Sequence, residues 1–164
     1  MVEDVVRAFG FLTLGTRMKR IGEHLQADTQ RIMDDMHVPL QASQYPFLAA
    51  LDRLGPLTIG ELADAVGITQ PGATRTLAQL VDLGMVTARH APEDQRRRVI
   101  SLSRKGQLVI EHAKREVWPR LEKAVADLCG ELSGPLLGQL AAIEDGLAAL
   151  PLDRRGRTNA RRRR

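Results

Sequence analysis

Two helix starts separated by one helix stop, all within residues 58–71, constrain the fold of this chain more than any other feature. Thr58 and Glu61 have the spacing of a capping box, in which each side chain accepts a hydrogen bond from a backbone N–H of the other residue. Gly67 stands where a left-handed residue ends a helix at little cost. Thr69 is a favourable N-cap for a second helix, and Pro71 falls in its first turn. The segment therefore predicts a helix-turn-helix unit.

The second of these helices is expected to bury one face and expose the other. Helical spacing collects small and apolar residues on the first face, namely Ala73, Leu77, Leu80, Val81 and Gly84. The exposed face and its flanks carry Pro71, Gly72, Thr74, Arg75, Thr76, Gln79 and Asp82. An exposed helix of this size fits the major groove of DNA.

A hairpin is predicted directly after the second helix. Residues 86–90 and 98–102 favour strands, and residues 91–97 form a polar loop that contains a proline. Residues 89–105 hold six basic and two acidic side chains, which concentrates positive charge at this hairpin. A helix-turn-helix followed by a basic hairpin is a winged helix, so we expect the hairpin to reach the DNA backbone or a minor groove.

The regions that precede the helix-turn-helix are predicted to be helical. Residues 3–36 predict one long helix with a break near residues 10–15, and Pro39 ends this region. Ser43 is expected to cap a short helix that has Pro46 in its first turn and stops at Gly55-Pro56. The residues that this short helix would bury are Phe47, Leu48, Leu51 and Leu54.

Two further helices are predicted after the hairpin, which makes the fold class mainly α with a small β-hairpin wing. One begins at Ser103 and runs to Cys129, and Pro119 must kink or interrupt it. Its predicted apolar stripe includes Leu108, Val109, His112, Val117, Leu121, Val125 and Leu128. The last begins at Ser133 and has a seam of Leu132, Leu136, Leu140, Ile143, Leu147 and Leu150. Periodicity alone leaves open whether that seam packs within its own subunit or against a partner helix.

The net charge of +4 comes from the C-terminal tail. Residues 153–164 contain seven arginines and one aspartate, so the remainder holds 17 basic and 19 acidic residues. Apart from Ala160 the tail lacks apolar residues, and it is expected to be disordered. A single cysteine, the absence of a signal peptide and the absence of a long apolar run point to a cytoplasmic protein without membrane contact.

The winged-helix prediction suggests which side chains meet DNA. Arg75 is suited to reading guanine and Gln79 to reading adenine. Residues near the helix N-terminus suit phosphate contact, namely Thr69, Gln70, Gly72 and Thr74. Arg89 and His90 are candidate phosphate contacts on the hairpin. For each of these residues the plain alternative is a solvated surface side chain.

The run from Leu57 to Gly106 resembles the MarR family of bacterial transcription regulators. The resemblance rests on GELADAVGIT, TRTLAQLVDLGMV, and a wing signature of Asp94-x-Arg96 followed by VISLSRKG. It implies that Arg96 enters the minor groove and that Asp94 braces an arginine or the loop. Arg97 and Arg98 are strand neighbours, so they are not both expected to face DNA. The chain departs from the family at residues 78–81, where Ala-Gln-Leu-Val replaces a frequent Asp-Arg-Leu-Glu.

The resemblance also implies a domain plan and a ligand site. Residues 1–40 and 105–152 would supply dimerisation helices, 41–104 the winged helix, and 153–164 the arginine-rich tail. An effector of aromatic or phenolic type would bind between the helical base and the DNA-binding lobe, with Arg17, His24, Tyr45 and Trp118 as the first candidates. Cys129 reads as a buried inert thiol, because family members that sense peroxide carry their reactive cysteine near the N-terminus.

Catalytic and metal-binding signatures are missing from the sequence, which predicts a protein without enzymatic activity or cofactor. Residues 10–16 have the glycine spacing of a phosphate loop but lack its lysine. The four histidines, His24, His37, His90 and His112, have no mutual ligand spacing.

The sequence thus predicts a homodimeric repressor that binds an inverted-repeat operator and is released by a small molecule. A protein-interaction module with no sequence-specific DNA binding is the rival from another class. The regulatory half of an enzyme fusion is a third interpretation, against which the length of the chain argues.

Overall fold

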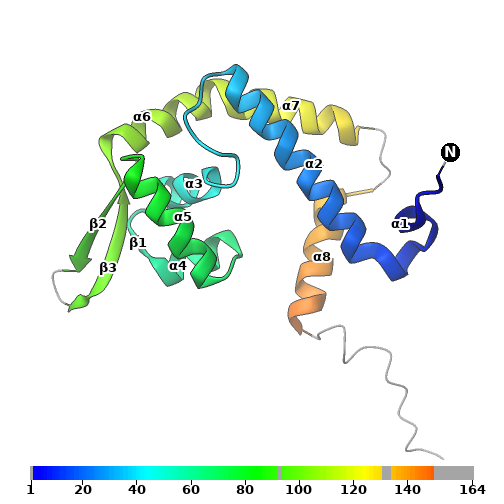
Figure 1. Ribbon diagram of the computed structural model, residues 1–164, viewed down its shortest axis with the longest axis horizontal. Helices are drawn as coiled ribbons and strands as arrows, with labels where there is room; N and C mark the ends of the chain where they lie inside the picture. Colours follow the sequence, from blue (N-terminus) through cyan, green and yellow to red (C-terminus); the bar gives the residue numbers. More distant parts are fainter. Residues whose placement is uncertain (1, 92–93, 131–133, 150–164) are drawn as a thin grey trace, which may run out of the picture. The chain divides into compact units, whose positions relative to one another are not determined.

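The computed structural model describes residues 2–91, 94–130 and 134–149 (Figure 1). It divides into two compact units, Met1–Lys123 and Ala124–Arg164, which are considered separately. The first unit contains α1 (Val5–Ala8), α2 (Leu14–Asp35), α3 (Tyr45–Leu54), β1 (Leu57–Thr58), α4 (Ile59–Val66), α5 (Gln70–Asp82), β2 (Val86–Ala91), β3 (Asp94–Leu102), α6 (Arg104–His112) and the start of α7 (Trp118–Cys129). The second contains the rest of α7 and α8 (Leu136–Ala149). Within the described residues, no helix is both long and apolar enough to cross a membrane.

The helix-turn-helix is formed by α4 and α5, and its predicted caps are confirmed. The Thr58 hydroxyl accepts from the backbone N–H of Glu61, and the Glu61 carboxylate accepts from the backbone N–H of Thr58. Gly67 closes α4 with φ 73°, a left-handed conformation that glycine adopts without strain. The Thr69 hydroxyl accepts from the N–H of Gly72 at 3.4 Å and starts α5.

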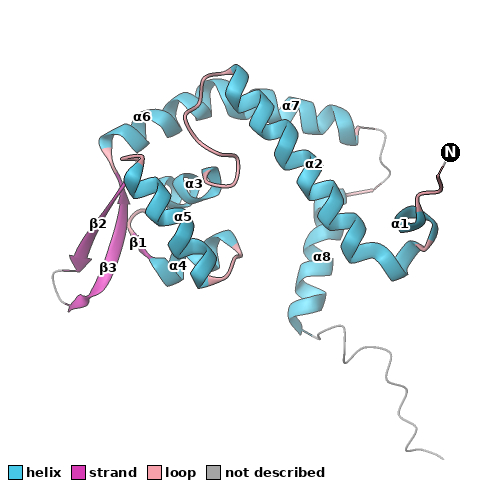
Figure 2. Ribbon diagram, in the orientation of Figure 1, coloured by secondary structure: helices cyan, strands magenta, loops and turns pink. Residues whose placement is uncertain are grey.

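The sheet has three antiparallel strands in the order β1-β3-β2 (Figure 2). The hairpin pairs Val86 with Leu102 and continues to His90 opposite Arg98, after which the register shifts to Ala91 opposite Asp94. The predicted loop over residues 91–97 was therefore too long, because β2 includes residue 91 and β3 begins at residue 94. Residues 92–93 lie outside the described part of the chain.

The strand β1 was not predicted from the sequence. It pairs Leu57 with Ile100 and Thr58 with Val99. Thr58 also caps α4, so the same two residues connect the third strand to the helix-turn-helix. A segment of this length carries no strand periodicity of its own and forms only because β3 offers a free edge.

One hydrophobic core joins the end of α2 to α3, α4, α5, the sheet and α6. Its fully buried large side chains are Met33, Phe47, Leu48, Leu62, Leu80, Met85, Ile110 and Val117. Five residues of the predicted apolar faces are exposed: Leu128 at 66%, Leu54 and Leu108 at 57% each, Val125 at 44% and Val81 at 43%. Leu54 is the last residue of α3, and Leu108 lies two positions from both Gly106 and Ile110, which puts it on the opposite side of α6. The predicted core residue Gly84 lies beyond the end of α5.

One predicted helix boundary agrees with the structure and two differ from it. The predicted break near residues 10–15 is confirmed as a 3-10 turn, Gly10–Thr13, between α1 and α2. The residue that precedes α3 is Gln44 rather than Ser43. The last helix begins at Leu136, and its predicted cap Ser133, like Leu132 and Leu150, lies outside the described residues.

The predicted interruption before Pro119 is confirmed as a π-helical turn, Ala113–Val117, between α6 and α7. Proline has no backbone N–H, and its ring clashes with the carbonyl four residues earlier in an α-helix. A turn with i→i+5 spacing relieves that clash by widening the helix just before the proline. Ala113 and Val117 are buried against the core, so the wide turn is packed rather than frayed.

Candidate nucleic-acid interface

The helix α5 presents a mixed surface to solvent. Ala73, Leu77 and Leu80 are buried at 0–3% exposure, which fixes the orientation of the helix on the core. The side opposite these residues is exposed along its length and contains Gln70, Pro71, Thr74, Arg75, Ala78 and Gln79. Within the described part of the chain, the Arg75 guanidinium has no hydrogen bond or ion pair. Its donors are therefore available to a ligand.

The threonines of α5 use their hydroxyl groups inside the helix. Thr74 Oγ1 donates to the carbonyl of Gln70 at 2.9 Å, and Thr76 Oγ1 donates to the carbonyl of Gly72 at 3.2 Å. A phosphate oxygen needs a donor, and the Thr74 hydroxyl proton is already given to the backbone. The prediction that the Thr74 hydroxyl contacts phosphate therefore does not fit this arrangement. Thr74 itself is exposed, and its methyl is the side-chain group that is not engaged by the helix backbone.

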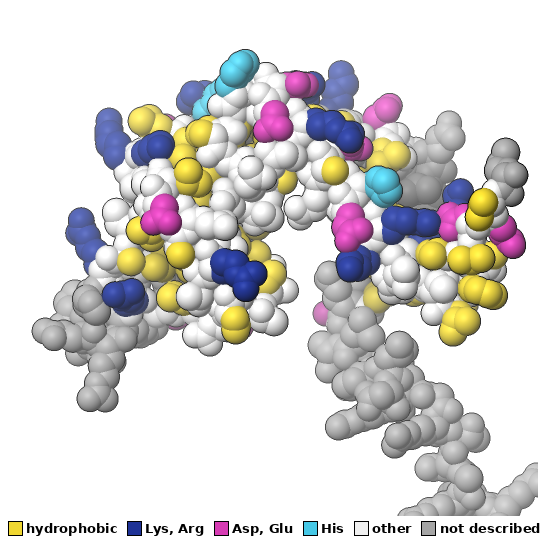
Figure 3. Space-filling model, viewed as in Figure 1, with side chains coloured by type: hydrophobic (Ala, Val, Ile, Leu, Met, Phe, Trp, Pro, Cys, Tyr) yellow, Lys and Arg dark blue, Asp and Glu magenta, His cyan; other side chains and the backbone are white. Residues whose placement is uncertain are grey.

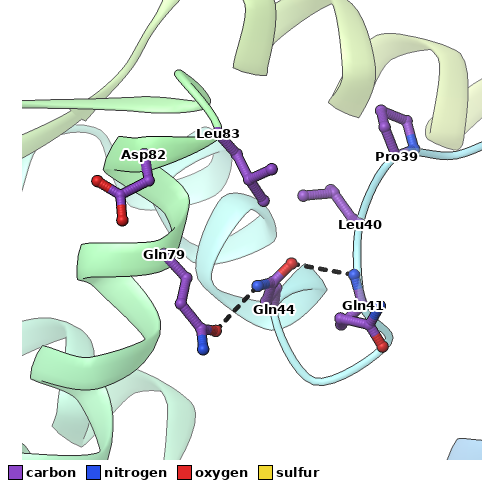
Figure 4. Close-up of a pocket in the computed structure, with 7 residues that line it drawn as sticks. All are labelled: Pro39, Leu40, Gln41, Gln44, Gln79, Asp82 and Leu83. Carbon is purple, nitrogen blue, oxygen red and sulfur yellow. Dashed lines mark hydrogen bonds between the residues drawn. The ribbon is translucent and has the colours of Figure 1, made fainter.

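Gln79 is tied to the α2–α3 connection. The Gln44 side chain, only 4% exposed, donates through Nε2 to Gln79 Oε1 at 3.1 Å and accepts from the N–H of Gln41 at 3.0 Å (Figure 4). These residues line an open cleft of about 430 Å³ beside α5, together with Pro39, Leu40, Asp82 and Leu83. Bidentate reading of adenine requires both the oxygen and the nitrogen of the amide, and the Gln79 oxygen is engaged.

The N-terminal turn of α5 is closed by its own cap. The Gly72 N–H is donated to Thr69, so that donor is unavailable to a phosphate. A Cβ at Gly72 would come within 3.3 Å of Thr69 Oγ1, which shows that residue 72 packs tightly against the cap. Of the predicted phosphate contacts at this end, Thr69 and Gln70 remain exposed.

The wing places two arginines at the surface. Arg89 on β2 and Arg98 on β3 are exposed, and their backbones pair with Val99 and His90 respectively. Figure 3 shows separate Lys and Arg side chains over the part of the first unit that holds α4, α5 and the sheet. Four further predicted DNA contacts lie on β2 and β3, and their side chains are outside the part of the structure that is described. These residues are His90, Asp94, Arg96 and Arg97.

The hydrogen bonds that connect the end of α5 to the start of α6 were not predicted from the sequence. The Lys105 ammonium donates to the carbonyl of Leu83 at 2.8 Å, and the Ser103 hydroxyl donates to the carbonyl of Gly84 at 2.6 Å. The backbone N–H of Ser103 donates to the carbonyl of Met85 at 3.0 Å. Two carbonyls at the end of α5 are thus satisfied by side chains from the start of α6, which fixes the two helices relative to each other.

The predicted effector residues are only partly brought together. The rings of Tyr45 and Trp118 meet edge to face with centroids 6.0 Å apart. Among the residues that the structure describes, Tyr45 Oη and Trp118 Nε1 are buried without a hydrogen-bond partner. Arg17 and His24 lie on α2, and neither contacts these rings among the described interactions.

A charged pair borders the two aromatic rings. Lys114 lies 5.9 Å from the centre of the Trp118 ring and forms an ion pair with Asp52. Burial raises the pKa of the Tyr45 hydroxyl, and the negative charge of Asp52 raises it further. The Tyr45 hydroxyl is thus held in its neutral form, as a donor without an acceptor in the described structure.

The fold, with the exposed surface of α5 followed by the β2–β3 wing, defines a winged helix-turn-helix protein of the DNA-binding class. A family model for the MarR family matches residues 38–97. The chain is 30% identical over 129 residues to the HTH-type transcriptional regulator FarR of Neisseria gonorrhoeae, which covers 76% of this chain and 86% of FarR. The chain belongs to the MarR family, whose members are transcriptional regulators rather than enzymes.

Another relative is matched over a smaller part of its length. The HTH-type transcriptional regulator ML2140 of Mycobacterium leprae is 34% identical over 77 residues, which are 47% of this chain and 54% of ML2140. The chain thus matches about half the length of that relative. The DNA complex of the transcriptional regulator MosR of Mycobacterium tuberculosis has a TM-score of 0.67 over 83% of this chain and 95% of MosR, at 21% identity. This likeness shows a shared fold.

Proposed function

We propose that this chain is a homodimeric transcriptional repressor that binds an inverted-repeat operator and is released by a small molecule. The observation that carries the proposal is α5, which buries Leu77 and Leu80 in the core and leaves Arg75 exposed without an intramolecular partner in the described structure. The family membership supports it, and the MosR structure of the same fold was determined in complex with DNA.

DNA binding would use α5 and the wing together. The exposed side of α5 would enter a major groove, where Arg75 meets a base edge. Arg89 and Arg98 would neutralise phosphates of the DNA strand that borders this major groove. The family resemblance implies that Arg96 would reach into the adjacent minor groove. Because phosphate neutralisation releases counterions, the affinity should fall steeply as the salt concentration rises.

The dimer is supported by apolar side chains that the single chain leaves exposed. On α2, Leu14, Met18, Ile21 and Leu25 follow helical spacing and are 37–49% exposed. In the preceding segment Phe11 and Leu12 are 93% and 83% exposed. Contiguous apolar surface of this kind marks an interaction site. A two-fold partner would bury it and would set two copies of α5 on one face of the duplex, about one helical turn apart.

An effector site is supported by the surroundings of α5 and α3. The Tyr45 and Trp118 rings carry two buried polar atoms that have no hydrogen-bond partner among the described residues. A ligand that opened this contact would satisfy them with a carbonyl or phenolic group. The cleft beside Gln44 and Gln79 lies directly against α5. A ligand that favours one position of α5 over another would change the spacing of the two recognition helices and so release the operator.

One observation favours a different function, a module that docks a partner protein. Val81, Leu83 and Ile68 around α5 are 39–43% exposed, so apolar side chains beside α5 are accessible to the surface of another protein. In that case α5 would bind an apolar surface, and its affinity would be insensitive to salt.

The deciding experiment is selection of bound duplexes from a random-sequence pool, followed by titration against unselected competitor DNA. We expect an enriched inverted repeat that is bound at least a thousandfold more tightly than random duplex. Sedimentation of the free protein and of the complex should give two subunits in each case. Enrichment of no sequence, with equal binding to all duplexes, would refute the operator proposal and favour the docking module.

A further inference from the structure

The surface of α5 beside Arg75 carries the amide of Gln79 on one side and the small residues Thr74 and Ala78 on the other. Thr74 and Ala78 are exposed four residues apart, so they are neighbours on the helix surface. The Thr74 hydroxyl is turned into the helix by its 2.9 Å bond to the carbonyl of Gln70. Ala78 follows Arg75 by three residues, so the methyl groups and the guanidinium adjoin each other.

The same surface continues into an apolar groove. A groove of about 280 Å³ runs between α5 and the sheet, and its lining includes Thr74, Ala78 and Val81 from α5 and Ala88 from β2. Two charged side chains of opposite sign, Arg98 and Asp82, also line the groove. The rest of the lining is mainly apolar, so the part beside Thr74 and Ala78 can accept an apolar group of a base.

Thymine is the one base with an apolar group in the major groove, its 5-methyl. Guanine, adenine and cytosine present donors or acceptors there, and these would lose water against methyl groups without gaining a partner. Resting on the proposed function, we propose that Thr74 and Ala78 read the 5-methyl group of a thymine that neighbours the base contacted by Arg75. The specificity of α5 would then come from one charged and one apolar contact side by side.

The test replaces each thymine of a selected duplex in turn with deoxyuridine, which keeps the base pair and removes only the methyl group. We expect one thymine in each half-site at which the wild-type protein loses about fourfold in affinity, the effect of one buried methyl group. All other thymines should tolerate the replacement within the error of the titration. Tolerance at every thymine would overturn the inference.

Variants of Thr74 assign the effect to this residue. Thr74→Ser keeps the hydroxyl that binds Gln70 and removes the methyl, so the deoxyuridine penalty should fall below twofold. Thr74→Val keeps a methyl at this position, so the penalty should persist. Thr76→Ser is the matched control, because its hydroxyl makes the same kind of bond to Gly72 on a less exposed part of the helix. An unchanged penalty in Thr74→Ser would also overturn the inference.

The outcomes separate this inference from the proposed function. A protein that binds a selected duplex selectively but is indifferent to deoxyuridine remains an operator-binding protein, and only the thymine contact is refuted. A protein that selects no duplex refutes both. Circular dichroism and urea unfolding of each variant show whether it is folded before its DNA affinity is compared.

Discussion

Gly106 at the start of α6 packs directly against the carbonyl group of Met85 in the turn after α5. A Cβ at residue 106 would overlap the Met85 oxygen, and it would also lie 3.1 Å from the Met85 carbonyl carbon and 3.3 Å from Leu102 Cδ2. Both chain segments are held there by hydrogen bonds, since Ser103 donates to the Met85 carbonyl and accepts from the Gly106 N–H. The contact cannot relax by rotating a side chain.

Gly106→Ala should therefore destabilise the folded protein by roughly 1–3 kcal/mol, the usual effect of forcing a methyl group into a packed site. The free energy of unfolding in urea measures this change. Gly60→Ala is the control: residue 60 is in α4 with nothing within 4 Å of an added Cβ. That variant should be neutral or more stable by up to about 1 kcal/mol, because alanine favours helix over glycine. Equal effects of the two substitutions would contradict the packing argument.

Arg75→Ala should weaken binding to the selected duplex by about 1–3 kcal/mol and relax the preference at one base pair. The reason is that the exposed guanidinium has no partner within the described part of the protein and would lose a base contact. Fluorescence anisotropy against the selected duplex and against single-base variants measures both effects. If the footprint and the affinity stayed unchanged, Arg75 would not belong to the interface.

Arg96→Ala should reduce affinity by a similar factor for every duplex, since a minor-groove or phosphate contact carries little sequence information. The slope of log affinity against log salt should become shallower by about one unit. Binding measured at four salt concentrations on selected and random duplexes gives both quantities. A loss confined to the selected duplex would assign Arg96 a base-reading role instead.

Gln79→Ala should lower the free energy of unfolding by about 1–2 kcal/mol, because the buried Gln44 amide would lose its acceptor. Gln79→Glu keeps an acceptor oxygen and should retain most of the stability. Urea unfolding in the absence of DNA isolates this structural role from any contribution to base reading. Equal loss in both variants would mean that the Gln44 contact does not stabilise the fold.

Tyr45 predicts how stability changes at alkaline pH. Its pKa is raised in the folded protein by burial and by Asp52, whereas an unfolded tyrosine ionises near pH 10. Above about pH 10 the unfolded chain loses this proton while the folded protein keeps it, so the free energy of unfolding should fall as the pH rises. Tyr45→Phe should remove that part of the pH dependence. Identical pH profiles for the two proteins would contradict the assignment.

The same substitution has a second expected outcome at neutral pH. The Tyr45 hydroxyl is buried and has no partner within residues 2–91, 94–130 and 134–149, so removing it should leave the stability unchanged or slightly increased. Thermal unfolding at pH 7 measures this. A clear loss of stability would show that the hydroxyl makes an interaction beyond those in the described structure.

The parts of the fold that the sequence predicted are those set by local interactions. The capping box of Thr58 and Glu61, the left-handed Gly67 and the Thr69 cap depend on residues at most four apart, and all three were confirmed. The interruption before Pro119 follows from proline chemistry, although its π-helical form did not follow from the sequence. The strands of the hairpin were found, but the length of its loop was not.

The features that escaped prediction depend on contacts between distant segments. β1 exists because Leu57 lies beside Ile100, and the Gln44–Gln79 bond joins residues 35 positions apart. Contacts between distant segments also limit how much of the candidate site could be predicted from the sequence. Spacing put Gln79 on the exposed face of α5, yet a residue from before α3 holds its oxygen. Thr74 was predicted as a hydroxyl donor because a sequence does not reveal which rotamer the helix backbone selects.

The π-helical turn makes α6 and α7 unusually sensitive to chain length. One inserted residue rotates every later side chain by about 100° around the helix axis. The π-helical turn supplies that rotation. As a result, Trp118 and Leu121 lie on the side of α7 that packs against the core. Loss of a single residue from 113–117 would swing both away from the core while preserving every amino acid on either side. For the packing of α7, the number of residues in the turn that joins it to α6 therefore matters as much as the identities of those residues.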